Sequence, residues 1–216
     1  GSGFKKGALI GFDSKLDAKD RRIGWDIYFN YNKQALGDGV IVTDKIDYPG
    51  QILADTVKIL PYSVNKDGKE TLGEPALVLG DDYSVDVSED GQTLTVAFLK
   101  DVSERYVISY QTTVPDISLP AYKNQALVKT DKGEFPYQAT VTYNKASNHL
   151  NKEAIGNPAQ VYIGDELNWK ISANEGLSVI KNAVISDTLS DGLTYKADSL
   201  VVKSVSGDTL VEGTDY

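Results

Sequence analysis

The 216-residue chain is acidic, with 22 Lys and Arg residues against 31 Asp and Glu residues and a net charge of −9. This charge repels phosphate backbones and anionic lipid, so it argues against nucleic acid and against a polybasic grip on a membrane. With no cysteine, a single histidine (His149) in a polar run, and no apolar run of roughly 18 residues, the sequence predicts no disulfide, metal site, cofactor or membrane insertion in this segment.

Strands dominate the chain from its first segments onward. Apolar residues recur at every second position in residues 23–29, 94–98 and 106–114, which is typical of strands buried on one face. Gly- and Asp-rich turn sequences separate these segments, and no stretch beyond ten residues holds a helical period. The pattern predicts an all-β sandwich.

An internal repeat divides the chain. Four segments of the first part recur in the same order in the second: 23–30 in 167–174, 40–46 in 183–189, 52–59 in 195–202, and 80–83 in 213–216. The first copy continues through further strands, whereas the second stops. We therefore expect a complete domain at residues 1–144 and an incomplete second domain at residues 145–216.

One acid stands where an apolar residue is expected. In VIVTDKI, residues 40–46, Asp44 shares its side of the alternation with Val40, Val42 and Ile46, and Asp187 repeats the arrangement in AVISDTL, residues 183–189. A strand-end Asp often only caps turn amides. An ionised carboxylate in a core, however, costs several kcal/mol, and the usual escape is a raised pKa that keeps the acid protonated.

Two further polar groups point toward the same core. Asn124, in YKNQALV, alternates with Tyr122 and Ala126, and Lys5 and Lys6 stand in the first strand. A desolvated, neutral lysine can attack a carboxamide whose carbonyl is polarised by a protonated Asp, releasing ammonia and leaving an amide cross-link. Such a spontaneous Lys–Asn isopeptide bond is a single-turnover reaction, so the protein is not expected to be an enzyme.

The segments FKKG, WDIYFN, VIVTDKIDYPGQIL, YVISYQTTV and YKNQA, in this order, resemble the immunoglobulin-like domains of Gram-positive collagen adhesins. The resemblance implies an immunoglobulin-like β-sandwich, in which Lys5 and Asn124 form the cross-linked pair and Asp44 is the catalytic acid. Alternation with Phe4, Ala8 and Ile10 would instead turn Lys6 inward. In the second repeat Asp187 matches the acid, and Lys145 or Lys152 is the candidate amine.

The resemblance implies an extracellular, cell-wall-anchored surface protein, in which this segment serves as a stalk or as a site for a host-matrix ligand such as collagen or fibrinogen. Neighbouring repeats of the same chain would be its other partners. The alternative is a pilin-like structural subunit, for which no sorting signal is recognisable. A glycan-acting enzyme would need two carboxylates flanking a cleft, and no such spacing is found.

Overall fold

The computed structural model describes residues 3–12, 18–117, 119–143, 150–156, 159–175 and 180–216. The chain separates into two compact units, residues 1–179 and 180–216. Within the described residues the first unit holds all of the strands, together with one short 3-10 helix, η1 (Ala18–Asp20). No helix among these residues is long and apolar enough to cross a membrane.

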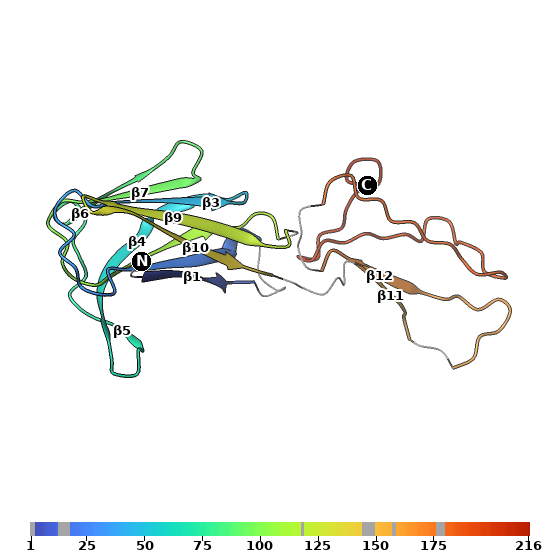
Figure 1. Cartoon of the computed structure of the whole chain (residues 1–216). Coiled ribbons are helices and arrows are strands. Elements are labelled where there is room, and N and C mark those ends of the chain that lie inside the picture. The colour runs from blue at the N-terminus through green and yellow to red at the C-terminus, as the bar shows by residue number, and fades with distance from the viewer. Residues whose placement is uncertain (1–2, 13–17, 118, 144–149, 157–158, 176–179) are drawn as a thin grey trace. The chain divides into compact units, whose positions relative to one another are not determined.

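Residues 3–141 form a β-sandwich of two five-stranded sheets (Figure 1). The first sheet has the order β1-β2-β8-β4-β5 and the second has the order β10-β9-β3-β7-β6. The strands are β1 (Gly3–Ile10), β2 (Arg22–Phe29), β3 (Ile41–Asp47), β4 (Ile52–Val64), β5 (Glu70–Leu72), β6 (Tyr83–Val87), β7 (Thr93–Phe98), β8 (Tyr106–Thr113), β9 (Tyr122–Thr130) and β10 (Gly133–Val141). The expected all-β, immunoglobulin-like architecture is confirmed.

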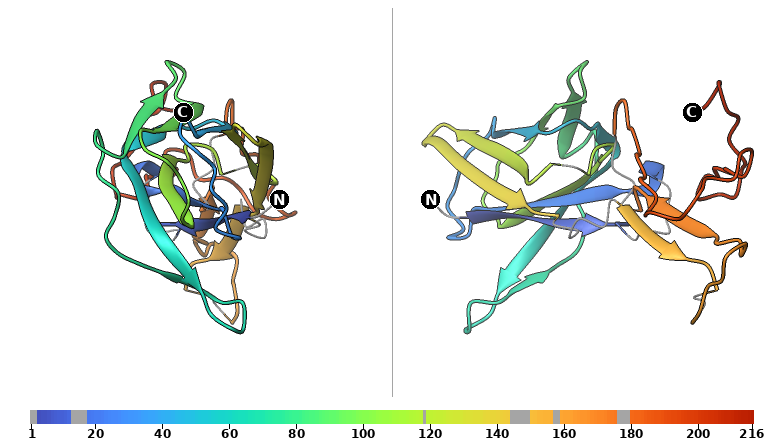
Figure 2. Two further views of the ribbon diagram at one scale, coloured as in Figure 1. Left: turned by 60° about the vertical axis from the view of Figure 1, so that its left-hand side comes forward. Right: turned by 90° about the vertical axis from the view of Figure 1, so that its right-hand side faces the viewer.

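The core lies between the two sheets and follows the alternation of the sequence. The alternation is most regular in β3, where buried and exposed residues alternate without exception. In β2 and β8 the other face also carries one buried residue, Tyr28 and Val107, in a second small cluster with Tyr62. The largest fully buried side chains include Trp25, Phe29, Tyr110 and Tyr122. Strand β4 is the longest; it runs beyond its neighbour and pairs there with β5 (Figure 2).

The second repeat keeps one feature of the first. Strands β11 (Leu150–Ala154) and β12 (Trp169–Ala173) pair so that Lys152 faces Ile171, in the same way as Lys5 of β1 faces Ile27 of β2. Residues 180–216, described by themselves, contain an isolated bridge between Lys203 and Thr209 but no strand among their described residues.

The strand expected at 183–189 is therefore not formed, and apolar residues such as Val184 and Ile185 are exposed. A strand needs a neighbouring strand to bond its backbone groups and a facing layer to cover its apolar side chains, and residues 180–216, taken by themselves, provide neither. A second immunoglobulin-like domain at residues 145–216 stays a prediction.

Gly7 of β1 lies on the inner face of its strand against Trp25. A Cβ atom at this position would stand 2.5 Å from Cζ3 of Trp25 and 2.6 Å from Cγ2 of Val141. These groups belong to a close-packed core and have little room to move. Glycine is thus required at this position by space alone.

We predict that Gly7→Ala lowers the free energy of unfolding by about 1–3 kcal/mol, because the added methyl group overpacks the core. The matched control is Gly24→Ala in β2, where the nearest atom to the new Cβ is the flexible end of Ile10 at 3.2 Å. Urea unfolding of both variants measures the effect. Equal midpoints for the two variants would contradict the packing argument.

Candidate functional site

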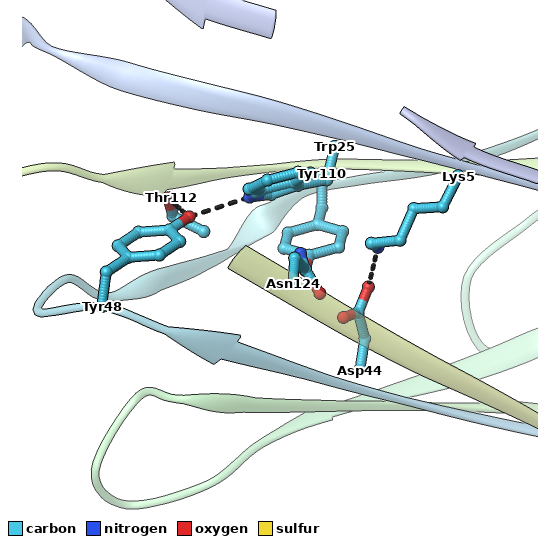
Figure 3. Close-up of polar contacts among 7 residues, drawn as sticks. All are labelled: Lys5, Trp25, Asp44, Tyr48, Tyr110, Thr112 and Asn124. Atoms are coloured by element: carbon cyan, nitrogen blue, oxygen red, sulfur yellow. Dashed lines mark hydrogen bonds and ion pairs between the residues drawn. The ribbon is translucent and has the colours of Figure 1, made fainter. Parts of the chain in front are cut away.

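Lys5 and Asp44 meet inside the sandwich, each from a different sheet. Both side chains are completely buried, and Nζ of Lys5 donates a hydrogen bond of 2.5 Å to Oδ2 of Asp44 (Figure 3). The alternation of β3 explains the position of Asp44, which shares the inner face with Val42 and Ile46. A buried ion pair is therefore present where the sequence placed an acid in an apolar row.

Strand β1 turns Lys5 inward and Lys6 outward. The alternation argument for Lys6 is wrong, because the apolar residues on which it rests lie on the outer face of the sheet. There the ring of Phe4 stacks on Tyr28 with centroids 4.5 Å apart, and Ile10 is 40% exposed. Lys6 is exposed, and its Nζ lies 5.1 Å from the centre of the Tyr28 ring.

Asn124 also lies in the core, beside Asp44. In the pairing of β3 with β9, Asp44 faces Ala126 and Ile46 faces Asn124, so the acid and the carboxamide are diagonal neighbours on one inner face. Asn124 is fully buried, and its Nδ2 donates a hydrogen bond of 2.6 Å to the hydroxyl oxygen of Tyr110. The fold thus brings together Lys5, Asp44 and Asn124, the three residues predicted from the sequence.

Two acceptor atoms of this site have no hydrogen-bond partner among the described residues: Oδ1 of Asp44 and Oδ1 of Asn124. Leaving a buried acceptor unsatisfied costs about 1–3 kcal/mol. A proton on Oδ1 of Asp44 would convert one of these acceptors into a donor for the other. The two unsatisfied acceptor atoms therefore favour the protonated form of Asp44.

Aromatic rings form the walls of the site. The Nζ atom of Lys5 lies 5.5 Å from the ring centre of Trp25 and 5.6 Å from that of Tyr110. The indole N–H of Trp25 donates to the hydroxyl of Tyr48 at 2.8 Å, and this hydroxyl is 2.6 Å from Oγ1 of Thr112. The polar ends of these buried rings are thus satisfied by one another, and water is kept from the amine.

Burial shifts the pKa values of the two ionisable groups in opposite directions. It lowers the pKa of the Lys5 amine, a shift that the Asp44 charge opposes. It raises the pKa of the Asp44 carboxyl, a shift that Lys5 and the nearby Tyr110 hydroxyl oppose. The charged pair, an ammonium and a carboxylate, holds the same number of protons as the neutral pair, an amine and a carboxylic acid. Transfer of one proton from Lys5 to Asp44 therefore gives the neutral pair at unchanged pH.

The sequence did not single out Tyr110, although its inward position could be read from the alternation of residues 106–114. The sequence does not reveal which group this hydroxyl contacts, because that group, the carboxamide of Asn124, lies in the other sheet. The pKa of Tyr110 is raised well above 10, first by burial and then by the Asp44 charge. Tyr110 is therefore a neutral phenol that contacts the carboxamide of Asn124.

The corresponding residues of the second repeat lie in two different units, so each is described by itself. Lys152 is exposed on β11, with its Nζ 4.6 Å from the ring centre of Trp169, and Asp187 is exposed in a segment without a strand. Lys145 and His149 lie outside the described residues. Over the described ranges, no group of three His, Asp or Glu side chains could hold a metal ion.

Comparison with known proteins identifies the family of the chain. The sequence model of the collagen binding domain matches residues 5–135, which is more than half of the chain, and the chain therefore belongs to this family. The resemblance to Gram-positive collagen adhesins that the sequence motifs indicated is confirmed. No curated protein sequence matches the chain.

Several solved structures are similar in part. The collagen-binding subdomain of the Enterococcus faecalis surface protein ACE is 13% identical, with 66% of this chain and 97% of that chain covered and a TM-score of 0.49. The collagen-binding domain from a Staphylococcus aureus adhesin is 14% identical, with coverages of 65% and 97% and a TM-score of 0.45. The major pilin SpaD from Corynebacterium diphtheriae is 13% identical, with coverages of 69% and 35% and a TM-score of 0.40.

Removal of one member of the buried pair tests the electrostatics of the site. In Lys5→Met the charge and the hydrogen bond of Lys5, which hold down the pKa of Asp44, are lost, so this pKa rises further above its value in the unfolded chain. The folded state then binds a proton that the unfolded state releases, and the free energy of unfolding falls as the pH rises above the unfolded pKa of about 3.9. We expect Lys5→Met to be less stable at pH 8 than at pH 4, relative to its control.

The control is the double variant Lys5→Met/Asp44→Leu, which removes both charges and fills the space. The difference in unfolding free energy between single and double variants, measured in urea across this pH range, isolates Asp44 from all other titrating groups. This difference in unfolding free energy should increase between pH 4 and pH 8 by about 1.4 kcal/mol for each unit by which folding raises the pKa of Asp44. A difference that does not vary with pH would contradict the assignment.

Proposed function

We propose that residues 1–144 form an adhesin domain of a Gram-positive bacterial surface protein and that an autocatalytic isopeptide bond between Lys5 and Asn124 stabilises it. The observation that carries the proposal is the buried pair of Lys5 and Asp44 next to a buried carboxamide whose carbonyl oxygen is unsatisfied among the described residues. Membership of the collagen binding domain family supports a non-enzymatic surface role, as an adhesin or a pilin-like subunit.

The reaction begins with the transfer of the proton from Lys5 to Asp44. The neutral amine then attacks Cγ of Asn124 while the protonated Asp44 donates to the carbonyl oxygen and stabilises its developing charge. The amine nitrogen loses a proton, the Asn124 nitrogen gains one, and ammonia leaves. One C–N bond breaks, another forms, and neither an oxidant nor a cofactor is needed.

The bond would join β1 of one sheet to β9 of the other. It closes a loop of roughly 120 residues, and by analogy with a disulfide this stabilises the domain by about 5 kcal/mol. Because both ends of the loop lie near the ends of the domain's sequence, the bond would carry a pulling force directly between them. Such reinforcement suits a protein that holds a cell to a surface.

The ligand in this proposal is a host extracellular-matrix protein, with collagen first and fibrinogen second. The family name supports collagen. The protein would be exposed on the cell wall, with neighbouring repeats of the same chain beside it. Residues 145–216 would belong to the next domain. There Asp187 would be the acid and Lys152 would be the amine, since Lys152 pairs in β11 as Lys5 does in β1.

The cross-link is tested by intact mass. We predict that the folded chain weighs less than its sequence by one ammonia, and that Asp44→Ala and Asn124→Ala have the full sequence mass. Both variants should fold but unfold at lower temperature, because the covalent tie is lost. Lys6→Met is the matched control and should still lose ammonia, since Lys6 is exposed. Full sequence mass in the wild type, or ammonia loss in Asp44→Ala, would rule out this mechanism.

The ligand is tested by solid-phase binding of the wild-type chain to immobilised collagen and fibrinogen. We expect saturable binding to collagen. Binding to fibrinogen alone would show that collagen is the wrong ligand but would agree with an adhesin role. Binding to neither protein would contradict a ligand site in this segment and favour a stalk.

A further inference from the structure

Tyr110 contacts the atom that must leave in the proposed reaction. It belongs to β8 in the first sheet, pairs with Trp25 across to β2, and is 1% exposed. Its hydroxyl oxygen accepts the hydrogen bond of 2.6 Å from Nδ2 of Asn124, which stands in the opposite sheet. The following inference rests on the proposed function, because it assigns Tyr110 a part in that reaction.

The hydrogen bond fixes the orientation of the carboxamide. With Nδ2 held by Tyr110, the carbonyl oxygen of Asn124 points away from the phenol, toward the side of Asp44 (Figure 3). A carboxamide turned over by half a rotation would present its N–H₂ group to the acid and its oxygen to the phenol. In the observed orientation, Asp44 can protonate the oxygen and Tyr110 lies at the leaving nitrogen.

The same hydroxyl group is close to the acid. Tyr110 is near enough to Asp44 to influence the pKa of the carboxyl, although Oδ1 of Asp44 makes no hydrogen bond among the described residues. The phenol keeps its proton in the folded state, because burial raises its pKa. It also accepts a hydrogen bond from Nδ2, so its own proton is directed to another atom. Tyr110 thus stands between a carboxyl that can supply a proton and a nitrogen that needs one.

We propose that Tyr110 is the third catalytic group of the cross-linking site and relays the proton from Asp44 to the leaving nitrogen of Asn124. When the amine has added to Cγ, the carboxamide nitrogen becomes tetrahedral and its lone pair can accept a hydrogen bond. The phenol donates its proton to this lone pair and regains one from Asp44, which has passed its first proton to the carbonyl oxygen and then taken the surplus proton of the Lys5 nitrogen. The C–N bond then breaks and ammonia leaves, the proton on the oxygen returns to Asp44 as the carbonyl group forms again, and Tyr110 ends as it began.

The inference is tested by the rate of cross-linking in Tyr110→Phe, which keeps the ring and removes the hydroxyl. Each chain is made by cell-free synthesis, portions are quenched in acid denaturant over time, and intact mass gives the fraction that has lost ammonia. General acid catalysis typically contributes about 100-fold or more, so Tyr110→Phe should cross-link at least about 100-fold more slowly than the wild type.

Tyr122→Phe is the matched control. It also removes a buried tyrosine hydroxyl, one that donates to the backbone oxygen of Asp116 at 2.6 Å and does not touch the carboxamide. It should cross-link at the wild-type rate. A wild type without ammonia loss would overturn the proposed function itself, whereas equal rates for the wild type and Tyr110→Phe would overturn only the relay.

A slow variant must also be shown to be folded. Amide hydrogen exchange of Tyr110→Phe should match that of Asn124→Ala, which we expect to fold without a cross-link. If Tyr110→Phe is unfolded, site-specific 3,5-difluorotyrosine at position 110 replaces it, since this residue keeps the shape and the hydroxyl but is a stronger acid. A relay predicts a change in rate of about twofold or more. An unchanged rate would mean that the hydroxyl only packs the core.

Discussion

The removal of Lys5 and Asp44 from water is the constraint on which the rest of this domain depends. In water the two groups would remain an ammonium ion and a carboxylate, and a lysine in that state is not a nucleophile. Between the two sheets both charges lose their hydration, the pKa values of the amine and the acid move toward each other, and the neutral pair comes within reach. An isolated buried ion pair contributes little to stability compared with an apolar pair. Its retention in the centre of this core is understandable if the pair reacts.

The surroundings of the pair follow from the same requirement. The rings of Trp25 and Tyr110 face the amine, and Gly7 leaves the space that the indole occupies. The ring hydroxyl and N–H groups bond to one another or to Asn124, so the aromatic walls exclude water without adding unsatisfied groups of their own. The two oxygens that have no hydrogen-bond partner in the described part of the chain, on Asp44 and Asn124, are those that the proposed proton transfer would join. Because the acid and the carboxamide come from adjacent strands of one sheet and the amine from the other, the proposed bond would fasten the sandwich across its core.

The sequence alone could predict the sandwich and most of this site, for reasons that differ from residue to residue. Strand alternation placed Asp44 and Asn124 inward, because their neighbours at every second position are apolar and buried. The same argument failed for β1, an edge strand whose outer face also carries apolar residues: Phe4 packs on Tyr28 outside the sandwich, and only the family resemblance indicated Lys5. Tyr110 was missed because its contact with Asn124 joins the two sheets, and no local pattern reports such a contact. In the second repeat the pairing of Lys152 follows the first, but Asp187 is exposed, since period alone does not provide a strand with neighbours.

Peptide mapping tests most directly whether these buried groups have reacted. The folded wild-type chain is digested, and fragmentation mass spectrometry is used to find the peptides that contain Lys5 and Asn124. The account predicts one branched peptide, in which the two residues are joined through an amide and the mass is lower than the sum of the two parts by one ammonia. Two separate linear peptides, with an unmodified lysine at position 5 and an unmodified asparagine at position 124, would contradict it.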